Sequence, residues 1–165
     1  MKHIYCCLIL ITLASTTWGQ NVVRTSCTYF PVNEKDSVCL NAQVNITPEE
    51  VEQIIGNEQD NVLLIFDGWV NWAKRLLSSN NLKNAEIVRC LKKYRIITLY
   101  VDDRVVVDTK DSTTVGKRNL MYQMDRFQAV TQPYYIIMKG GKAKCSSGYL
   151  STPQEVLALF KRCER

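Results

Sequence analysis

Residues 62–68 read Val-Leu-Leu-Ile-Phe-Asp-Gly, an apolar run of strand length followed by a turn signal. Five apolar residues without alternation are typical of a strand that is covered on both faces. Asp67-Gly68 ends the run, and residues 69–77 favour a helix. We therefore expect a buried strand that leads into a helix, with Asp67 capping that helix through its backbone donors.

Helices and further strands alternate on both sides of this strand. Thr47-Pro48-Glu49-Glu50 predicts the start of a helix, because Thr47 can act as N-cap and Glu50 completes a capping box. The same pattern over residues 152–155, Thr-Pro-Gln-Glu, predicts the last helix. Between them the sequence predicts helices over residues 85–94 and 117–127, and strands over residues 95–101, 134–138 and 143–149, the last two joined at Gly140-Gly141.

This order is helix, strand, helix, strand, helix, strand, strand, helix. Alternation followed by a closing hairpin implies a small mixed sheet, parallel first and antiparallel at its edge. The predicted fold class is α/β, with three layers, a mixed four-stranded sheet and helices on both faces. The residues expected to face the core are Ile87, Cys90, Leu91 and Tyr94 in one helix and Leu120, Met124 and Phe127 in the next.

Residues 1–20 have the composition of a secretory signal peptide. A short basic start precedes an apolar stretch over residues 4–14 and a small, polar stretch over residues 15–20. The apolar stretch is too short to span a membrane, and Cys6 and Cys7 come too early for a lipid-attachment cysteine. We expect cleavage near Gly19, no membrane span in the mature chain, and an exported protein, either periplasmic or secreted.

The composition argues against several classes of chemistry. His3, the one histidine of the 165 residues, lies in the predicted signal peptide, so no imidazole is left for a triad or a metal site. The net charge of +5 is spread among acids without a long basic run, which argues against nucleic-acid binding. Asp102 and Asp103 are neighbours at a strand end and point to opposite sides, which favours a turn over acid-base catalysis. No cofactor is expected.

Five of the seven cysteines remain once the signal peptide is removed, in a compartment where disulfides persist. Cys27 and Cys39 bracket a segment with little periodicity, and a bridge between them would staple an otherwise loose arm. Cys145 and Cys163 are the second candidate pair, which leaves Cys90 unpaired on the apolar stripe of its helix. The spacing matches no zinc pattern, so no metal site is expected.

Two segments of the chain resemble a known family. Residues 95–103 read Arg-Ile-Ile-Thr-Leu-Tyr-Val-Asp-Asp, and Gln132-Pro133-Tyr134-Tyr135 opens a predicted strand. These segments are similar to the thioredoxin-like domains of DsbD-type disulfide-interchange and cytochrome c biogenesis proteins, particularly those of Bacteroidetes. The resemblance covers roughly residues 62–160. It implies a thioredoxin-like fold in which a cis-proline, Pro133, faces the redox site.

With this resemblance, the predicted organisation is a signal peptide over residues 1–20, an N-terminal arm with Cys27 and Cys39 over residues 21–46, and a thioredoxin-like domain over residues 47–165.

The chain departs from this family at the redox site. Where the family has Phe-Thr-Gly, an aromatic residue and then Cys-Val-Asn-Cys-Arg-Lys, residues 66–74 of this chain read Phe-Asp-Gly-Trp-Val-Asn-Trp-Ala-Lys. One alignment puts Trp69 and Trp72 on the cysteine positions, and another pairs residues 66–69 with the Phe-Thr-Gly-aromatic run. In both alignments the thiols are lost, and an indole can neither attack nor resolve a disulfide. The buried acid of many thioredoxins is also expected to be missing, because residues 62–66 are all apolar.

These features predict an exported thioredoxin-fold protein without the dithiol site, which acts as a redox-inactive binding or accessory module of the cell envelope. An extended polypeptide partner would bind a platform next to the proline. No catalytic residue is expected in this interpretation. The platform residues are Trp69, Trp72, Gln132, Pro133 and Tyr134.

Two alternatives stay open. A thiol-disulfide oxidoreductase would use relocated cysteines, Cys145 with Cys163 or Cys90, under reducing input from a membrane partner. An interaction protein such as an immunity or inhibitor protein is neither supported nor contradicted by the sequence. The thiols discriminate between the first two functions, because a catalyst needs an accessible pair that cycles and a binding module holds inert bridges.

Overall fold

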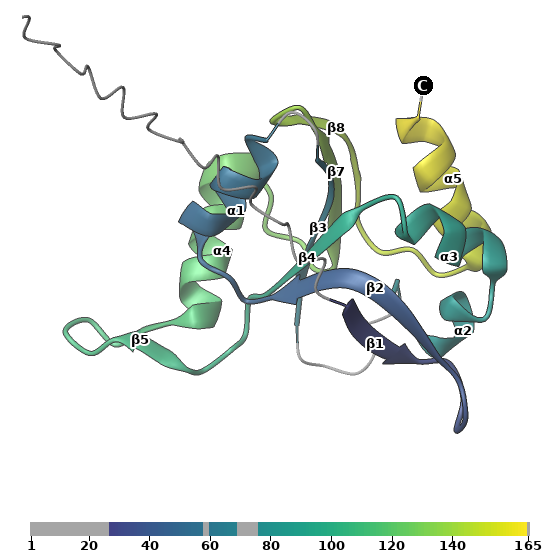
Figure 1. Ribbon diagram of the computed structural model, residues 1–165. Helices are drawn as coiled ribbons and strands as arrows, with labels where there is room; N and C mark the ends of the chain where they lie inside the picture. Colours follow the sequence, from purple (N-terminus) through teal and green to yellow (C-terminus); the bar gives the residue numbers. More distant parts are fainter. Residues whose placement is uncertain (1–26, 58–59, 69–75, 165) are drawn as a thin grey trace, which may run out of the picture.

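A mixed sheet of six strands forms the centre of the computed structural model, which describes residues 27–57, 60–68 and 76–164 (Figure 1). The strands in their spatial order are β1 (Cys27–Pro31), β2 (Ser37–Val44), β4 (Arg95–Tyr100), β3 (Asn61–Asp67), β7 (Tyr134–Lys139) and β8 (Lys142–Ser147). β2, β4 and β3 run parallel to one another. β1 pairs antiparallel with β2 at one edge, and β7 and β8 continue the sheet antiparallel at the other.

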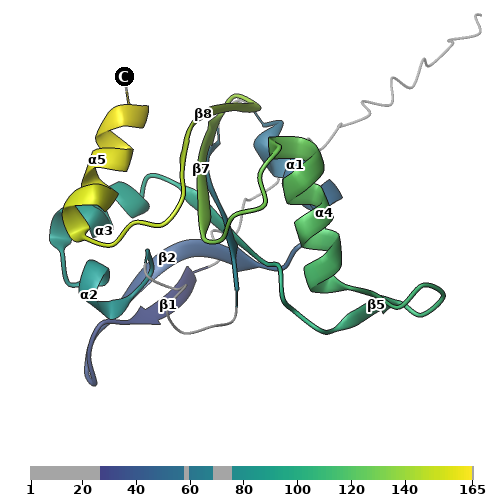
Figure 2. The ribbon, with the colours of Figure 1, turned by 180° about the vertical axis from the view of Figure 1, so that it is seen from behind.

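Helices cover both faces of this sheet (Figures 1 and 2). α1 (Pro48–Ile55) and α4 (Val115–Phe127) lie on one face, and α2 (Ser79–Leu82), α3 (Ala85–Leu91) and α5 (Pro153–Cys163) lie on the other. The predicted α/β class, with a mixed sheet between helices, is confirmed. None of the helices in the described ranges is long and apolar enough to cross a membrane.

Alternate residues of the strands contribute to two separate cores, one on each face of the sheet. Leu64, Phe66 and Ile136 belong to the core under α1 and α4. The other core lies under α2, α3 and α5 and includes Leu63, Ile65, Tyr135 and Ile137.

Both predicted capping boxes form. The Glu50 amide donates to Thr47 Oγ1 at 3.2 Å, and the Thr47 amide donates to Glu50 Oε2 at 2.7 Å. Thr152 and Glu155 make the same reciprocal pair of bonds at the start of α5. The predicted turn between β7 and β8 is also present. Its two glycines have φ values of 56° and 70°, which residues with a side chain rarely adopt.

The sheet has six strands rather than the four predicted, because residues 27–44 contribute β1 and β2. Leu40 and Ala42 of β2 are buried, and Ala42 lies opposite Ile96 of β4. The alternation of Val38, Leu40, Ala42 and Val44 is a strand signal that the interpretation based on cysteine spacing passed over. The described part of the predicted N-terminal arm, residues 27–46, thus contributes two strands to the sheet, and the predicted Cys27–Cys39 bridge joins them.

The apolar stripe predicted for the helix over residues 117–127 is only partly right. Met124 is 45% exposed, and the buried face of α4 carries Asn119 and Gln123 instead. Asn119 Nδ2 donates to the Tyr100 carbonyl at 2.9 Å, and Gln123 Nε2 donates to the Thr131 carbonyl at 2.9 Å. Side-chain amides that satisfy buried main-chain carbonyls thus take the place of apolar contacts on this face.

Candidate functional site

An apolar cleft of about 500 Å³ opens at the carboxyl ends of the parallel strands. Val44, Tyr100 and Asp67, the last residues of β2, β4 and β3, all line it. In open α/β sheets, ligands bind at this end of the strands. The remaining lining residues come from the strands of the sheet, β1 included, and from residues 76–79 at the start of α2: Phe30, Pro31, Ala42, Ile65, Leu76, Leu77, Ser78, Ser79, Thr98 and Tyr135.

The polar groups of the cleft lie mainly on the sheet. Asp67 is 3% exposed, and its Oδ1 accepts a hydrogen bond from the Gly68 amide at 2.9 Å. Thr98 and Tyr135 are also buried. Burial raises the pKa of Tyr100 above its ordinary value, and the carboxylates of Asp67 and Asp102 raise this pKa further. Tyr100 therefore stays a neutral phenol that can donate a hydrogen bond at neutral pH.

A buried carboxylate is present where the resemblance led us to expect none. Residues 62–66 are apolar as noted, but Asp67, the next residue of β3, is buried at the edge of the cleft. A carboxylate in apolar surroundings favours a cationic or hydrogen-bond-donating group beside it. Residues 69–75 of the helix that Asp67 is predicted to cap lie outside the described residues, and residues 76–77 form a turn.

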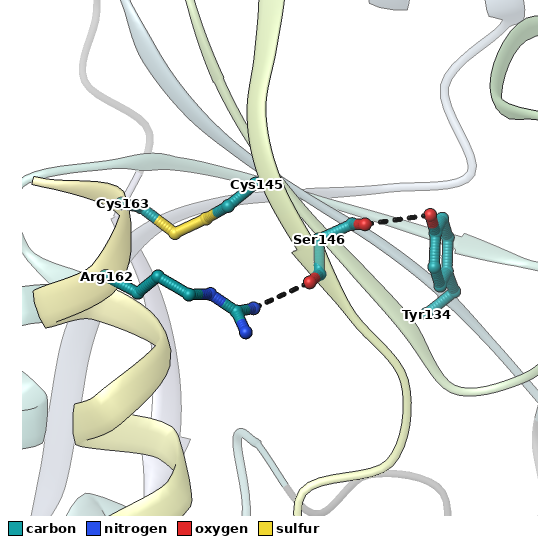
Figure 3. The surroundings of a disulfide bond; sticks show 5 residues. All are labelled: Tyr134, Cys145, Ser146, Arg162 and Cys163. Carbon is teal, nitrogen blue, oxygen red and sulfur yellow. Dashed lines mark hydrogen bonds between the residues drawn. A yellow bond between two sulfur atoms is a disulfide. The ribbon is translucent and has the colours of Figure 1, made fainter. Parts of the chain in front are cut away.

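Two of the three described platform residues, Gln132 and Tyr134, contact the side of the sheet that carries α1 and α4. Gln132 is half-buried, and its Nε2 donates to Gln123 Oε1 at 2.9 Å. Pro133 is buried, and its preceding peptide bond is cis, which is the isomer that the resemblance implies. Tyr134 packs against the core under α1 and α4, and its hydroxyl bonds Ser146 Oγ at 3.0 Å (Figure 3).

Tyr135 rather than Tyr134 therefore reaches the cleft, because neighbouring residues of a strand point to opposite faces. Trp69 and Trp72, the other two predicted platform residues, lie outside the described residues. Tyr135, Thr98 and Tyr100 are lining residues that sequence reasoning missed. In the sequence, only their position within the predicted apolar strands could have pointed to these three residues.

Two disulfides join the pairs of cysteines that the sequence favours. Cys27 and Cys39 link β1 to β2, with 5.5 Å between their Cα atoms. Cys145 and Cys163 link β8 to α5, with a Cα separation of 5.7 Å (Figure 3). None of the described cysteines lines the cleft.

Cys90 is the free cysteine of the described residues. It is half-buried on α3 and packs against the core under α2, α3 and α5. Burial raises the pKa of its thiol above the ordinary value, and this effect is the largest one acting on it. Because the thiolate is the reactive species, Cys90 is a poor nucleophile at neutral pH.

A polar network that sequence reasoning missed holds the rim of the cleft. Asn45 directly follows β2 and has a φ of 50°, a left-handed conformation that asparagine tolerates. Its Oδ1 accepts from the Tyr100 amide at 2.8 Å and from Asn119 Nδ2 at 3.2 Å. Its Nδ2 donates to Asp103 Oδ2 at 2.6 Å. The ends of β2 and β4 and the start of α4 are thereby tied together.

Within the described ranges, no group of three or more histidine, cysteine, aspartate or glutamate side chains is placed to hold a metal ion. The described geometry defines an α/β protein with an apolar cleft at the carboxyl ends of its parallel strands. No protein-family model matches the chain, and no curated protein matches it either.

Proposed function

We propose that the chain is an exported, thioredoxin-fold protein without the dithiol site, which binds an extended segment of a polypeptide partner. The partner would lie across the cleft at the ends of β2, β4 and β3. The two disulfides are compatible with an exported protein. The periplasm and the extracellular space are the proposed locations.

The arrangement of elements supports the proposed fold. Three parallel strands precede the closing β7–β8 hairpin, helices lie on both faces of the sheet, and a proline directly precedes β7. This is the layout that the resemblance implies. β1 is an addition at the edge of the sheet next to β2.

The observation that carries the binding function is the cleft beside the end of β3. In the resembling family this point of the chain leads into the two catalytic cysteines. Here it borders a cavity of mostly apolar lining with the buried carboxylate of Asp67, and the described cysteines lie elsewhere. Apolar lining with a few placed polar groups is typical of binding sites.

The first test measures catalysis of thiol-disulfide exchange. We expect the mature protein from Gln20 onward, purified without reductant, not to accelerate the reduction of insulin disulfides by dithiothreitol. The reason is that burial raises the pKa of the Cys90 thiol and the other described cysteines are bridged. Cys145→Ser and Cys90→Ser variants are measured in parallel. Acceleration that one of these variants abolishes would replace the binding function with an oxidoreductase that uses relocated cysteines.

The second test measures binding at the cleft. Val44 lines the cleft at 49% exposure, so Val44→Asp puts a charge at its rim with little effect on folding. We expect this variant to bind a reduced and alkylated unfolded protein roughly tenfold more weakly, because the charge loses solvation under a bound chain. Fluorescence anisotropy of the labelled unfolded protein gives the dissociation constant.

Val130→Asp is the matched control, because Val130 is 59% exposed and does not line the cleft. It should bind like the wild type. Trp69→Ala and Trp72→Ala variants extend the same assay to the predicted platform. Equal weakening by Val44→Asp and Val130→Asp would place the binding surface outside the cleft.

A further inference from the structure

A small hairpin projects from the body of the protein between β4 and α4 (Figures 1 and 2). It consists of β5 (Val106–Asp108) and β6 (Thr113–Thr114), which pair antiparallel with a register shift between Val106 and Asp108. Val105, Val106 and Val107 are 62%, 51% and 47% exposed. Three adjacent exposed valines in a strand form an apolar surface on both faces of this hairpin.

The outer edge of β5 carries main-chain groups that face away from β6. The Val115 amide donates to the Val105 carbonyl at 2.8 Å, so this carbonyl points toward β6. The N–H of Val106 belongs to the same peptide unit and points the opposite way. Within the described residues, β5 pairs with no strand other than β6. Its outer edge therefore offers the main-chain groups of Val106 to another strand.

The charges that flank the valines are complementary to a second copy of the same strand. Antiparallel pairing about a two-fold axis at Val106 puts Val106 opposite Val106 of the other copy. The same register puts Arg104 opposite Asp108, and it does so twice by symmetry. Both side chains are exposed, and among the described residues neither takes part in an ion pair within the chain. Opposite charges that face each other across strands stabilise the pair.

The two edge strands of the six-stranded sheet, β1 and β8, are less suited to pairing with a second copy. On β8, Lys142 and Lys144 are exposed, and Arg162 Nη2 donates to the Ser146 carbonyl at 2.7 Å (Figure 3). β1 ends at Pro31, whose main-chain nitrogen carries no hydrogen to donate. Charged side chains, prolines, bulges and short strands are the usual means by which edge strands avoid pairing. β5 is short and its pairing with β6 shifts register between Val106 and Asp108, but residues 105–107 contain neither a charged side chain nor a proline.

We propose that two copies of this chain associate through β5. The β5 strands of the two copies pair antiparallel, so that the two hairpins form one continuous sheet. The valines pack at the centre, and the Arg104–Asp108 pairs close both ends. The contact involves a short strand from each copy, so the dimer is weak and forms with rising concentration. The proposal does not depend on the cleft or on the function proposed above.

Two charge reversals at the hairpin test this register. Arg104→Asp puts two acids opposite each other, and Asp108→Arg puts two arginines opposite each other, so each variant alone should stay monomeric. Mixed in equal amounts, the two variants should form a heterodimer, because every flanking pair is again of opposite charge. Sedimentation velocity should detect this heterodimer at concentrations similar to those at which the wild type dimerises, and each variant alone should remain monomeric there.

Matched controls separate the register from the overall charge. Arg89→Asp and Glu34→Arg change the net charge by the same amounts at exposed positions of α3 and of the β1–β2 turn. Each should dimerise like the wild type, and mixing them should add nothing. Val106→Lys puts two like charges at the centre without touching Arg104 or Asp108 and should be monomeric.

Three results would overturn the proposal. One is a wild type that stays monomeric at concentrations on the order of hundreds of micromolar. Another is a dimer that survives in Val106→Lys. The third is a mixture of the two reversed variants, both folded by circular dichroism, that does not associate.

Discussion

Gly116→Ala should lower the free energy of unfolding by about 3 kcal/mol, because the added methyl group has no space. A Cβ at Gly116 would lie 2.6 Å from the Asp103 nitrogen and 2.7 Å from the Val101 oxygen, both of which belong to the main chain. The Gly116 amide also donates to the Asp103 carbonyl at 2.9 Å, so the start of α4 lies directly on this segment. Equilibrium urea denaturation of the two proteins measures the difference.

Residues 101–103, whose main chain a Cβ at Gly116 would meet, are held in place. Asn45 bonds both the Tyr100 amide and the Asp103 carboxylate, which holds the chain on either side of Val101. Gly148→Ala is the matched control, since the nearest atom to a Cβ there is the Pro133 oxygen at 3.9 Å. We expect a change within about 0.5 kcal/mol for this control. Similar stability of the two variants would contradict the close approach at Gly116.

Replacing both Cys145 and Cys163 by serine should also destabilise the protein by about 3 kcal/mol. The bridge closes a segment with a sequence separation of 18 residues, and it links the edge strand β8 to the last helix. Its loss frees the unfolded chain of that constraint and leaves two half-buried hydroxyls against the core under α2, α3 and α5. Urea denaturation without reductant gives the free energies.

The control for this pair is Cys90→Ser, which breaks no bridge and should cost about 1 kcal/mol or less. A double variant as stable as the wild type would remove the structural role of the Cys145–Cys163 bridge. That outcome would favour the alternative in which these cysteines cycle between thiol and disulfide.

Local signals predicted most of the secondary structure. The run over residues 62–66, the capping boxes at Thr47 and Thr152 and the glycine turn after β7 depend on neighbours within a few residues, and all are present. β2 was missed although its signal is local. Its period-2 pattern over residues 38–44 starts next to Cys39 and contains one small residue, Ala42, and the interpretation stopped at the segment between the two cysteines.

The candidate site was predicted less well, because it depends on which face of a strand each residue occupies. Tyr134 and Tyr135 are equivalent as sequence, and only the register that pairs Tyr135 with Ile65 assigns Tyr135 to the cleft side. The burial of Asp67 follows from elements that pack around the end of β3, which no local pattern reports. Asn119 and Gln123 were hidden for the same reason, since their partners are main-chain carbonyls of other segments.

The position of β2 also implies an order of assembly during synthesis. One edge of β2 pairs with β1 across a short turn, so this hairpin can form and be bridged by Cys27–Cys39 as soon as it emerges. The other edge waits for β4, which arrives only after α1, β3 and α3. Pairs so distant in sequence form slowly. The β1–β2 hairpin thus forms first, and the remaining strands of the sheet pair with it as the chain is completed.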